Sequence, residues 1–144
     1  MGLRWFSSYC FSRKCLVPVV LPKRRRVVAC LHGTAANGAI FKIQCAKLVD
    51  RARDQDLDLV FVDAPRLVDA RNEWAALMHK YFGDKQILRE FAPATLDDRG
   101  WRTYADPTGV ADEASDAVLR ACGGKWPDAL LGFSQGANIV TILA

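Results

Sequence analysis

The sequence is poor in the residues on which metal and disulfide chemistry depend. It has only two histidines, His32 and His79, and its five cysteines show neither a Cys-x-x-Cys pair nor any other spacing typical of metal ligands. Their number is odd, and Cys30, Cys45 and Cys122 fall within apolar patterns. This usage argues against a secreted disulfide scaffold and favours reduced core cysteines in a cytoplasmic protein. We expect neither a metal ion nor an organic cofactor.

Long apolar runs are also absent, and no stretch approaches the roughly 18 residues expected of a membrane span. Acidic residues are missing before Asp50, whereas nine Lys and Arg precede it. The net charge of +4 therefore reflects the N-terminal part of the chain and does not indicate a nucleic-acid-binding face. We expect a basic leader over residues 1–25 and a folded domain from Arg26.

Three interpretations of this leader stay open. Its basic and serine-rich, acid-free composition matches a transit segment for a mitochondrion or plastid. The run Lys23–Arg26 alternatively resembles a short nuclear or polyanion-binding patch. The third interpretation is a poorly ordered extension or a mistranslated upstream stretch.

The segment Ala129–Val140 carries the strongest functional signal. An apolar run leads into Gly132-Phe133-Ser134-Gln135-Gly136, and an apolar-periodic run follows. This G-x-S-x-G pattern between a strand and a helix is typical of a nucleophile elbow, which exposes a serine hydroxyl at the end of a parallel sheet. Glycines are needed there because the helix leaves at once and packs closely on the strand. Ser134 is the predicted nucleophile.

A second segment supports the first. Residues 26–31 are almost entirely apolar, as expected of a strand buried on both faces, and they lead directly into His32-Gly33-Thr34. In an α/β-hydrolase, this early loop and the residue after the nucleophile each supply one backbone N–H to the oxyanion hole. The predicted donors are Thr34 and Gln135, and Gly33 allows the backbone to approach a bound carbonyl.

These motifs resemble the FSH-type serine hydrolases, small α/β-hydrolases without a lid domain. The resemblance rests on Leu31-His32-Gly33, on Phe61-Val62-Asp63-Ala64-Pro65 and on the Phe-Ser-Gln within the elbow, with Trp101 as a looser match. It covers residues 26–144. The resemblance implies a partial α/β-hydrolase fold of three layers, with a central parallel sheet, that ends after the elbow. It also implies that the acid and the histidine of the triad lie beyond residue 144.

The remaining elements follow from periodicity and breakers. We predict helices over 37–52, 69–82 and 108–122, and a second buried strand over 57–62, with the strand before His32 in the middle of the sheet. Asp69 would cap the second helix, which would bury Trp74, Leu77, Met78 and Tyr81. Residues 84–106 form a long irregular connection, expected to shape the substrate mouth.

The predicted function is hydrolysis of a small carboxylic ester or thioester through an acyl-serine intermediate. His32 is interpreted as a structural histidine bonded to backbone or as a pocket residue, while His79 is expected to be solvated. Asp63 either lines the pocket or caps a strand end, and Trp101 either packs or contacts substrate. We expect the 144 residues alone to be inactive.

Other functions fit the same sequence. A non-catalytic binding or interaction module on a truncated hydrolase scaffold is the main alternative. A carboxylesterase or an acyl-protein thioesterase would use the same serine.

Overall fold

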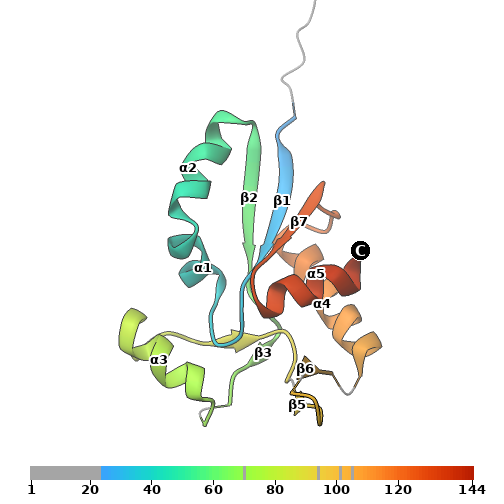
Figure 1. Cartoon of the computed structure of the whole chain (residues 1–144). Helices are drawn as coiled ribbons and strands as arrows, with labels where there is room; N and C mark the ends of the chain where they lie inside the picture. The colour runs from blue at the N-terminus through green and yellow to red at the C-terminus, as the bar shows by residue number, and fades with distance from the viewer. Residues whose placement is uncertain (1–23, 70, 94, 101, 105) are drawn as a thin grey trace, which may run out of the picture.

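The central sheet has three parallel strands. A computed structural model describes residues 24–144 except 70, 94, 101 and 105 (Figure 1). Strands β1 (Arg26–Leu31), β2 (Leu57–Val62) and β7 (Ala129–Gly132) are hydrogen-bonded in the order β2-β1-β7. The prediction that the strand before His32 lies in the middle is confirmed. Trp101 lies outside the described residues.

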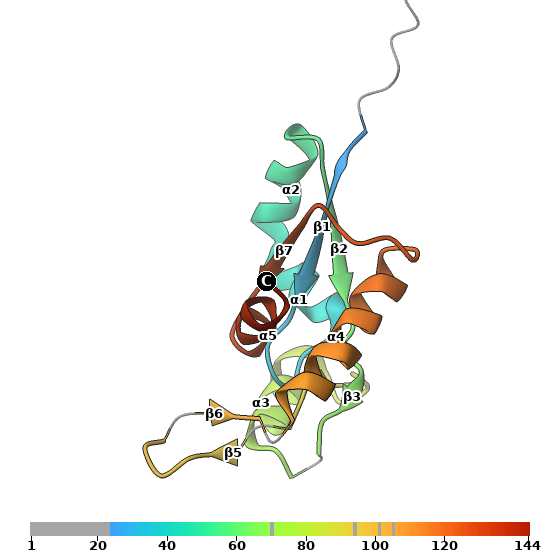
Figure 2. The same cartoon turned by 90° about the vertical axis from the view of Figure 1, so that its right-hand side faces the viewer.

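Helices cover both faces of this sheet, which confirms the predicted three-layer α/β arrangement. The first layer comprises α1 (Gly38–Gln44) and α2 (Ala46–Asp54), and the opposite layer comprises α4 (Pro107–Ala121) and α5 (Gln135–Leu143) (Figures 1 and 2). Ala29, Cys30 and Leu31 of the central strand are completely buried between the layers. A strand covered on both faces needs a continuous apolar run, and β1 supplies it.

The helix predicted over 37–52 is two helices, with a break at Cys45. The Asn37 side chain caps the first by accepting a hydrogen bond from the Ile40 N–H. Phe41 of α1 packs against Phe61 and Phe133, with ring centroids 5.7 and 6.2 Å apart.

Helix α3 (Glu73–Phe82) differs from the prediction in its start and in its buried face. Asn72 caps it by accepting from the Trp74 N–H, whereas the Asp69 carboxylate pairs with Arg71. The predicted burial is wrong for Trp74, Leu77 and Tyr81, which are exposed. Met78 is half-buried against a core cluster, and Ala75 is the buried residue of the helix. The reason is its position: α3 lies beyond the carboxyl ends of the strands and not over the sheet (Figure 1).

The connection after α3 contains short paired strands. β4 (Arg89–Glu90) pairs with β3 (Arg66–Leu67), and β5 (Thr95–Leu96) pairs with β6 (Arg102–Thr103) in a hairpin that projects from the body (Figure 2). The connection also enters the core, since Phe91 and Ala92 are completely buried. Helix α4 follows, as predicted over 108–122, and it buries Val110, Ala114, Ala117 and Val118.

The last two residues of the predicted leader contact the domain. Arg24 lies 3.2 Å from the Asp128 carboxylate, and the Arg25 guanidinium donates to the Leu57 carbonyl oxygen. Asp128 also accepts from the Val27 N–H at 2.7 Å. The rest of the leader, residues 1–23, lies outside the described residues. Among the helices that the structure describes, none has the length and apolarity to cross a membrane.

Candidate active site

Ser134 occupies the turn between β7 and α5. Its φ of 53° and ψ of −119° are unusual for a residue with a side chain, and such a conformation costs roughly 1–3 kcal/mol. The flanking glycines show why the turn is so tight. A Cβ on Gly132 would lie 2.6 Å from the Ala137 Cα, and one on Gly136 would lie 2.7 Å from the His32 carbonyl oxygen. Both contacts are too close for any side chain, so the elbow geometry predicted for this motif is present.

The loop after β1 lies directly against Ser134. A Cβ on Gly33 would be 3.1 Å from the Ser134 Cβ, which leaves little room for a side chain at position 33. Beyond Gly33 the chain turns through Thr34 and Ala35, the latter with a φ of 57°. The hydroxyl of Thr34 is buried and has no hydrogen-bond partner among the described residues. The structure thus brings Gly33, Thr34 and Ser134 together.

Gln135 begins α5, and its side chain turns into the protein. As the first helical residue, it has a backbone N–H with no partner inside the helix. The residue is 2% exposed, and its carboxamide makes two hydrogen bonds, accepting from the Phe91 N–H at 2.8 Å and donating to the Ala92 carbonyl oxygen at 2.7 Å. The elbow motif predicts a role only for the backbone of Gln135, and no sequence signal indicates this use of its side chain.

His32 is completely buried, and its hydrogen bonds define its tautomer. The Ala64 backbone N–H donates to Nε2 at 3.2 Å, so the ring proton must be on Nδ1, which donates to the Gly33 carbonyl oxygen at 2.7 Å. Burial lowers the pKa of His32, outweighing the opposite effect of the Gly33 hydrogen bond. The imidazole is therefore neutral, holds two backbone segments, and does not line the pocket beside Ser134.

Asp63 follows β2 and lies at a different hollow. Its Oδ1 accepts from the Gly38 N–H at 2.8 Å, at the start of α1. The hollow beside it is lined by Asn37, Ala39, Lys85, Gln86, Ile87 and Arg89, and not by Ser134. Asp63 therefore lies at the end of β2, and its carboxylate binds the N-terminus of α1.

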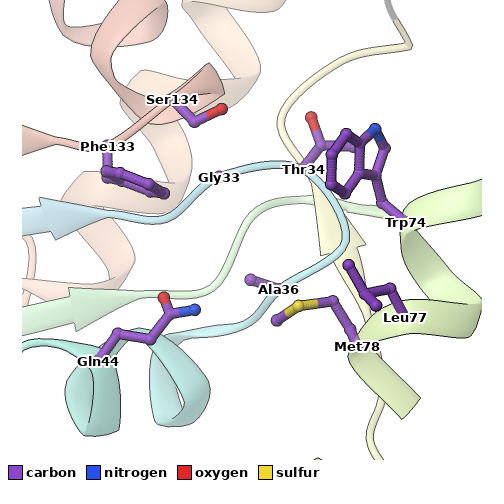
Figure 3. A pocket seen from close by; sticks show the side chains of 9 residues that line it. All are labelled: Gly33, Thr34, Ala36, Gln44, Trp74, Leu77, Met78, Phe133 and Ser134. Carbon is purple, nitrogen blue, oxygen red and sulfur yellow. The ribbon is translucent and has the colours of Figure 1, made fainter. Parts of the chain in front are cut away.

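A pocket of about 300 Å³ opens beside Ser134. Figure 3 shows Ser134 and Phe133 on one side and α3 on the other, with the Gly33–Ala36 loop between them. The wall from α3 consists of Trp74, Leu77 and Met78, and Gln44 completes the lining. Ser134, Thr34 and Gln44 are polar, and all the other lining residues are apolar, aromatic or glycine. None of the described residues of 84–106 lines this pocket, although that connection was expected to shape the mouth.

The α3 wall was not predicted, because the apolar stripe of this helix was expected to face the core. A stripe at helical spacing shows that one face avoids water, but it cannot distinguish a protein core from a ligand pocket. Here Trp74 is 45% exposed and lines the pocket, so this face of α3 belongs to the pocket and not to the core.

Among the described residues, the cysteines and histidines do not line this pocket. Burial raises the pKa of Cys30 to about 12, which keeps its thiol protonated and unreactive. His79 lines a separate hollow with Leu67 and Ile87. Among the described residues no three His, Cys, Asp or Glu side chains are grouped closely enough to hold a metal ion.

A parallel sheet covered on both faces, with a strained serine in a glycine-flanked turn at the carboxyl end of a strand, defines an α/β-hydrolase arrangement. Comparison with known families gives the narrower class. The sequence pattern of the serine hydrolase (FSH1) family matches residues 23–144, and the chain belongs to this family.

Curated relatives are esterases by name. The chain is 31% identical over 118 residues to esterase citA of Monascus ruber, which aligns with 81% of this chain and 44% of that protein. Esterase OVCA2 of Danio rerio is 29% identical over 129 residues, covering 81% of this chain and 54% of OVCA2. Probable esterase afoC of Emericella nidulans is 32% identical over 129 residues, covering 81% of this chain and 41% of afoC. The chain thus spans about half the length of these relatives.

Proposed function

We propose that the protein hydrolyses a carboxylic ester through an acyl-enzyme intermediate on Ser134. One observation carries this proposal: Ser134 is held at a φ of 53° between two glycines that admit no side chain, with Gly33 against its Cβ. A strained serine at the mouth of a pocket, next to a second backbone loop, is the arrangement that acyl transfer requires. The names of the relatives support the same chemistry.

The backbone N–H groups of Thr34 and Gln135 are proposed to stabilise the oxyanion. Attack of Ser134 Oγ on the substrate carbonyl carbon forms a tetrahedral intermediate, and negative charge develops on the former carbonyl oxygen. Two fixed N–H donors at that position stabilise the charge more than they stabilise the neutral substrate. Loss of one such donor lowers the rate by roughly 10²- to 10³-fold.

Neither histidine of the chain is arranged to act as general base for Ser134. The Nε2 lone pair of His32 is used by the Ala64 N–H, and His79 is at a separate hollow. We propose that the base is a histidine outside these 144 residues, oriented by a carboxylate that also lies outside them. This expectation comes from the chain order of triads in α/β-hydrolases, and the greater length of the relatives is consistent with it. The 144 residues alone should then be nearly inactive.

The acyl group is proposed to occupy the pocket between Phe133 and α3. This pocket adjoins Ser134, and its walls present the apolar side chains of Trp74, Leu77 and Met78. Apolar walls favour a hydrocarbon acyl group over a charged one, because burying an unpaired charge is costly. His32, Asp63 and Trp101 were also predicted to bind substrate; the first two do not line this pocket.

Several finer assignments are proposals of the same kind. A thioester would react at the same serine and stays an alternative substrate. A non-catalytic binding module on this scaffold is the rival function, although the strained turn at Ser134 favours catalysis. We propose a cytoplasmic location, with an organelle as the alternative if residues 1–25 are a transit segment.

Labelling with a fluorophosphonate probe tests the proposal. The full-length protein should be labelled and should hydrolyse a short p-nitrophenyl ester, and Ser134→Ala should abolish both. Ser115→Ala, on α4, is the matched control and should retain both. Equal labelling and turnover of the Ser134→Ala variant would exclude Ser134 as the nucleophile, and a full-length protein without either activity would favour the binding module.

A further inference from the structure

One segment, Gln86–Ala92, contacts the loops that follow all three strands of the central sheet, and we call it the strap. After β1, the Ala36 carbonyl oxygen accepts from the Arg89 N–H at 2.7 Å. After β2, the Ala64 carbonyl oxygen accepts from the Arg89 guanidinium at 3.2 Å. After β7, the Gln135 carboxamide binds the backbone at Phe91 and Ala92. The strap therefore joins three loops that are far apart in sequence.

The contact with Gln135 is held in a single orientation. The carboxamide accepts at Oε1 and donates at Nε2, so a flipped amide would place oxygen against oxygen and nitrogen against N–H. With 2% of Gln135 exposed, water cannot replace either partner. A buried amide with both ends satisfied by backbone is held rigidly, since rotation breaks two hydrogen bonds at once.

The strap is equally well held against the loop that carries Thr34. Phe91 is completely buried, and its ring lies against the His32 ring with centroids 5.3 Å apart. Asn37 donates to the Ile87 carbonyl oxygen at 3.1 Å. The contacts to His32, Ala36 and Asn37 thus flank Thr34 on both sides along the chain.

We infer that the Gln135 carboxamide is a positioning group that, through the strap, fixes the Gln135 backbone N–H relative to the Thr34 N–H. The two proposed oxyanion donors belong to different loops, about a hundred residues apart in sequence, and the strap contacts both loops. Stabilisation of an oxyanion depends on donors held in place before the charge develops. The catalytic part of this inference rests on the proposed function, whereas the mechanical coupling of the two loops does not.

The first experiment measures catalysis per active site. Gln135→Met in the full-length protein keeps the length of the side chain and removes both hydrogen bonds. Saturating fluorophosphonate gives the concentration of competent sites, so a loss of folded protein is separated from a slower site. We expect kcat per site to fall about tenfold to a hundredfold with KM nearly unchanged. Complete loss of one oxyanion donor lowers the rate by roughly 10²- to 10³-fold, and a donor that is only misplaced should lower it by less. Affinity for a trifluoromethyl ketone, which forms a tetrahedral adduct, should fall by a similar factor.

Two further variants make this comparison sharp. Gln55→Met is the same substitution in a residue that precedes β2, at the opposite end of the sheet, and should leave kcat per site unchanged. Gln135→Glu keeps the acceptor for the Phe91 N–H and, when ionised, loses the donor to Ala92, so its kcat per site should also fall, and it provides a second test if Gln135→Met does not fold. A wild-type kcat per site in whichever of the two Gln135 variants folds would overturn the positioning role.

Hydrogen exchange tests the coupling independently of activity. In Gln135→Met, amide exchange should accelerate both in the strap, residues 86–92, and in the loop of residues 33–36. Acceleration confined to the strap would show that the two loops are not coupled and would overturn the inference. Should Ser134→Ala retain hydrolysis, the proposed function fails, but this exchange measurement still decides whether the strap joins the two loops.

Discussion

Gly136 and Leu31 are in direct backbone contact, so that a Cβ on Gly136 would overlap the Leu31 carbonyl group. The first turn of α5 therefore rests on the carboxyl end of β1 with no side chain between them. This contact sets the distance between the elbow and the loop that begins at His32. It places the two halves of the candidate active site side by side.

Substitution of Gly136 should disrupt this contact. We expect Gly136→Ala to lower the free energy of unfolding by at least about 1–3 kcal/mol, as for other overpacked sites, and to abolish labelling of Ser134. Gly124→Ala is the control, because a Cβ there meets nothing and only the φ of 80° is unfavourable. Thermal unfolding and probe labelling give the two readouts. A Gly136→Ala variant as stable and as reactive as wild type would contradict the close approach.

His32 should make stability depend on pH. Because its pKa is lowered in the folded state, the unfolded chain binds a proton below about pH 6.5 that the folded chain does not. Stability should therefore be complete above that pH and fall as the pH drops toward the folded-state pKa. Unfolding measured from pH 8 to pH 5 should show a steeper loss for wild type than for His32→Gln. Identical profiles for wild type and His32→Gln would contradict the buried neutral ring.

The α3 wall should determine which acyl groups are accepted. Leu77→Ala removes apolar surface from the pocket, and each substrate methylene that is no longer buried costs about 0.8 kcal/mol, or roughly fourfold in kcat/KM. We expect the decrease to grow with acyl length across a series of p-nitrophenyl esters and to be small for the acetate. Tyr81→Ala, one turn further along the same exposed face but outside the pocket lining, is the control. A decrease that is equal for every ester would place the acyl group elsewhere.

Gln135→Glu should be most stable, relative to wild type, in acid. A buried glutamate beside the Ala92 carbonyl oxygen is disfavoured when charged, so its folded-state pKa should rise above the ordinary value of about 4.3. Protonated, it can donate to Ala92 as the amide does. The stability deficit should therefore be smallest below about pH 4 and grow as the pH rises through the folded-state pKa. Thermal unfolding at a series of pH values measures it, and a deficit independent of pH would argue against the Ala92 contact.

The parts of the fold that could be predicted from the sequence are those in which one local feature, an apolar run or a pair of glycines, determines the structure. The strands β1 and β2 span the residues predicted from two largely apolar runs, each with one charged residue, Arg26 and Asp58, because the faces that they turn to the flanking helices are apolar. The turn at Ser134 was predictable because glycine is required at two fixed positions. In both cases the local residues alone impose the structure.

The parts that were missed depend on contacts between distant segments. Asn72 and Asp69 are both residue types that cap helices, and in the structure Asn72 accepts from the Trp74 N–H while Asp69 pairs with Arg71. The strap has neither helical nor strand periodicity, and its partners at Ala36, Ala64 and Gln135 are distant in sequence. A side chain such as Gln135, which bonds backbone at both ends, leaves no pattern in its own neighbourhood.

The parallel pairing of β1 with β7 has a consequence for how the protein is made. Strand β2 pairs with β1 after a connection of ordinary length, whereas Val27 and Asp128, which are joined at the start of the β1–β7 pair, lie 101 residues apart along the chain. Closing so long a loop is slow, and a chain emerging from the ribosome folds from its N-terminal end. One edge of β1 therefore stays unpaired until β7 has been synthesised, and Ser134, which follows β7, can take its place beside the loop after β1 only once that edge is paired.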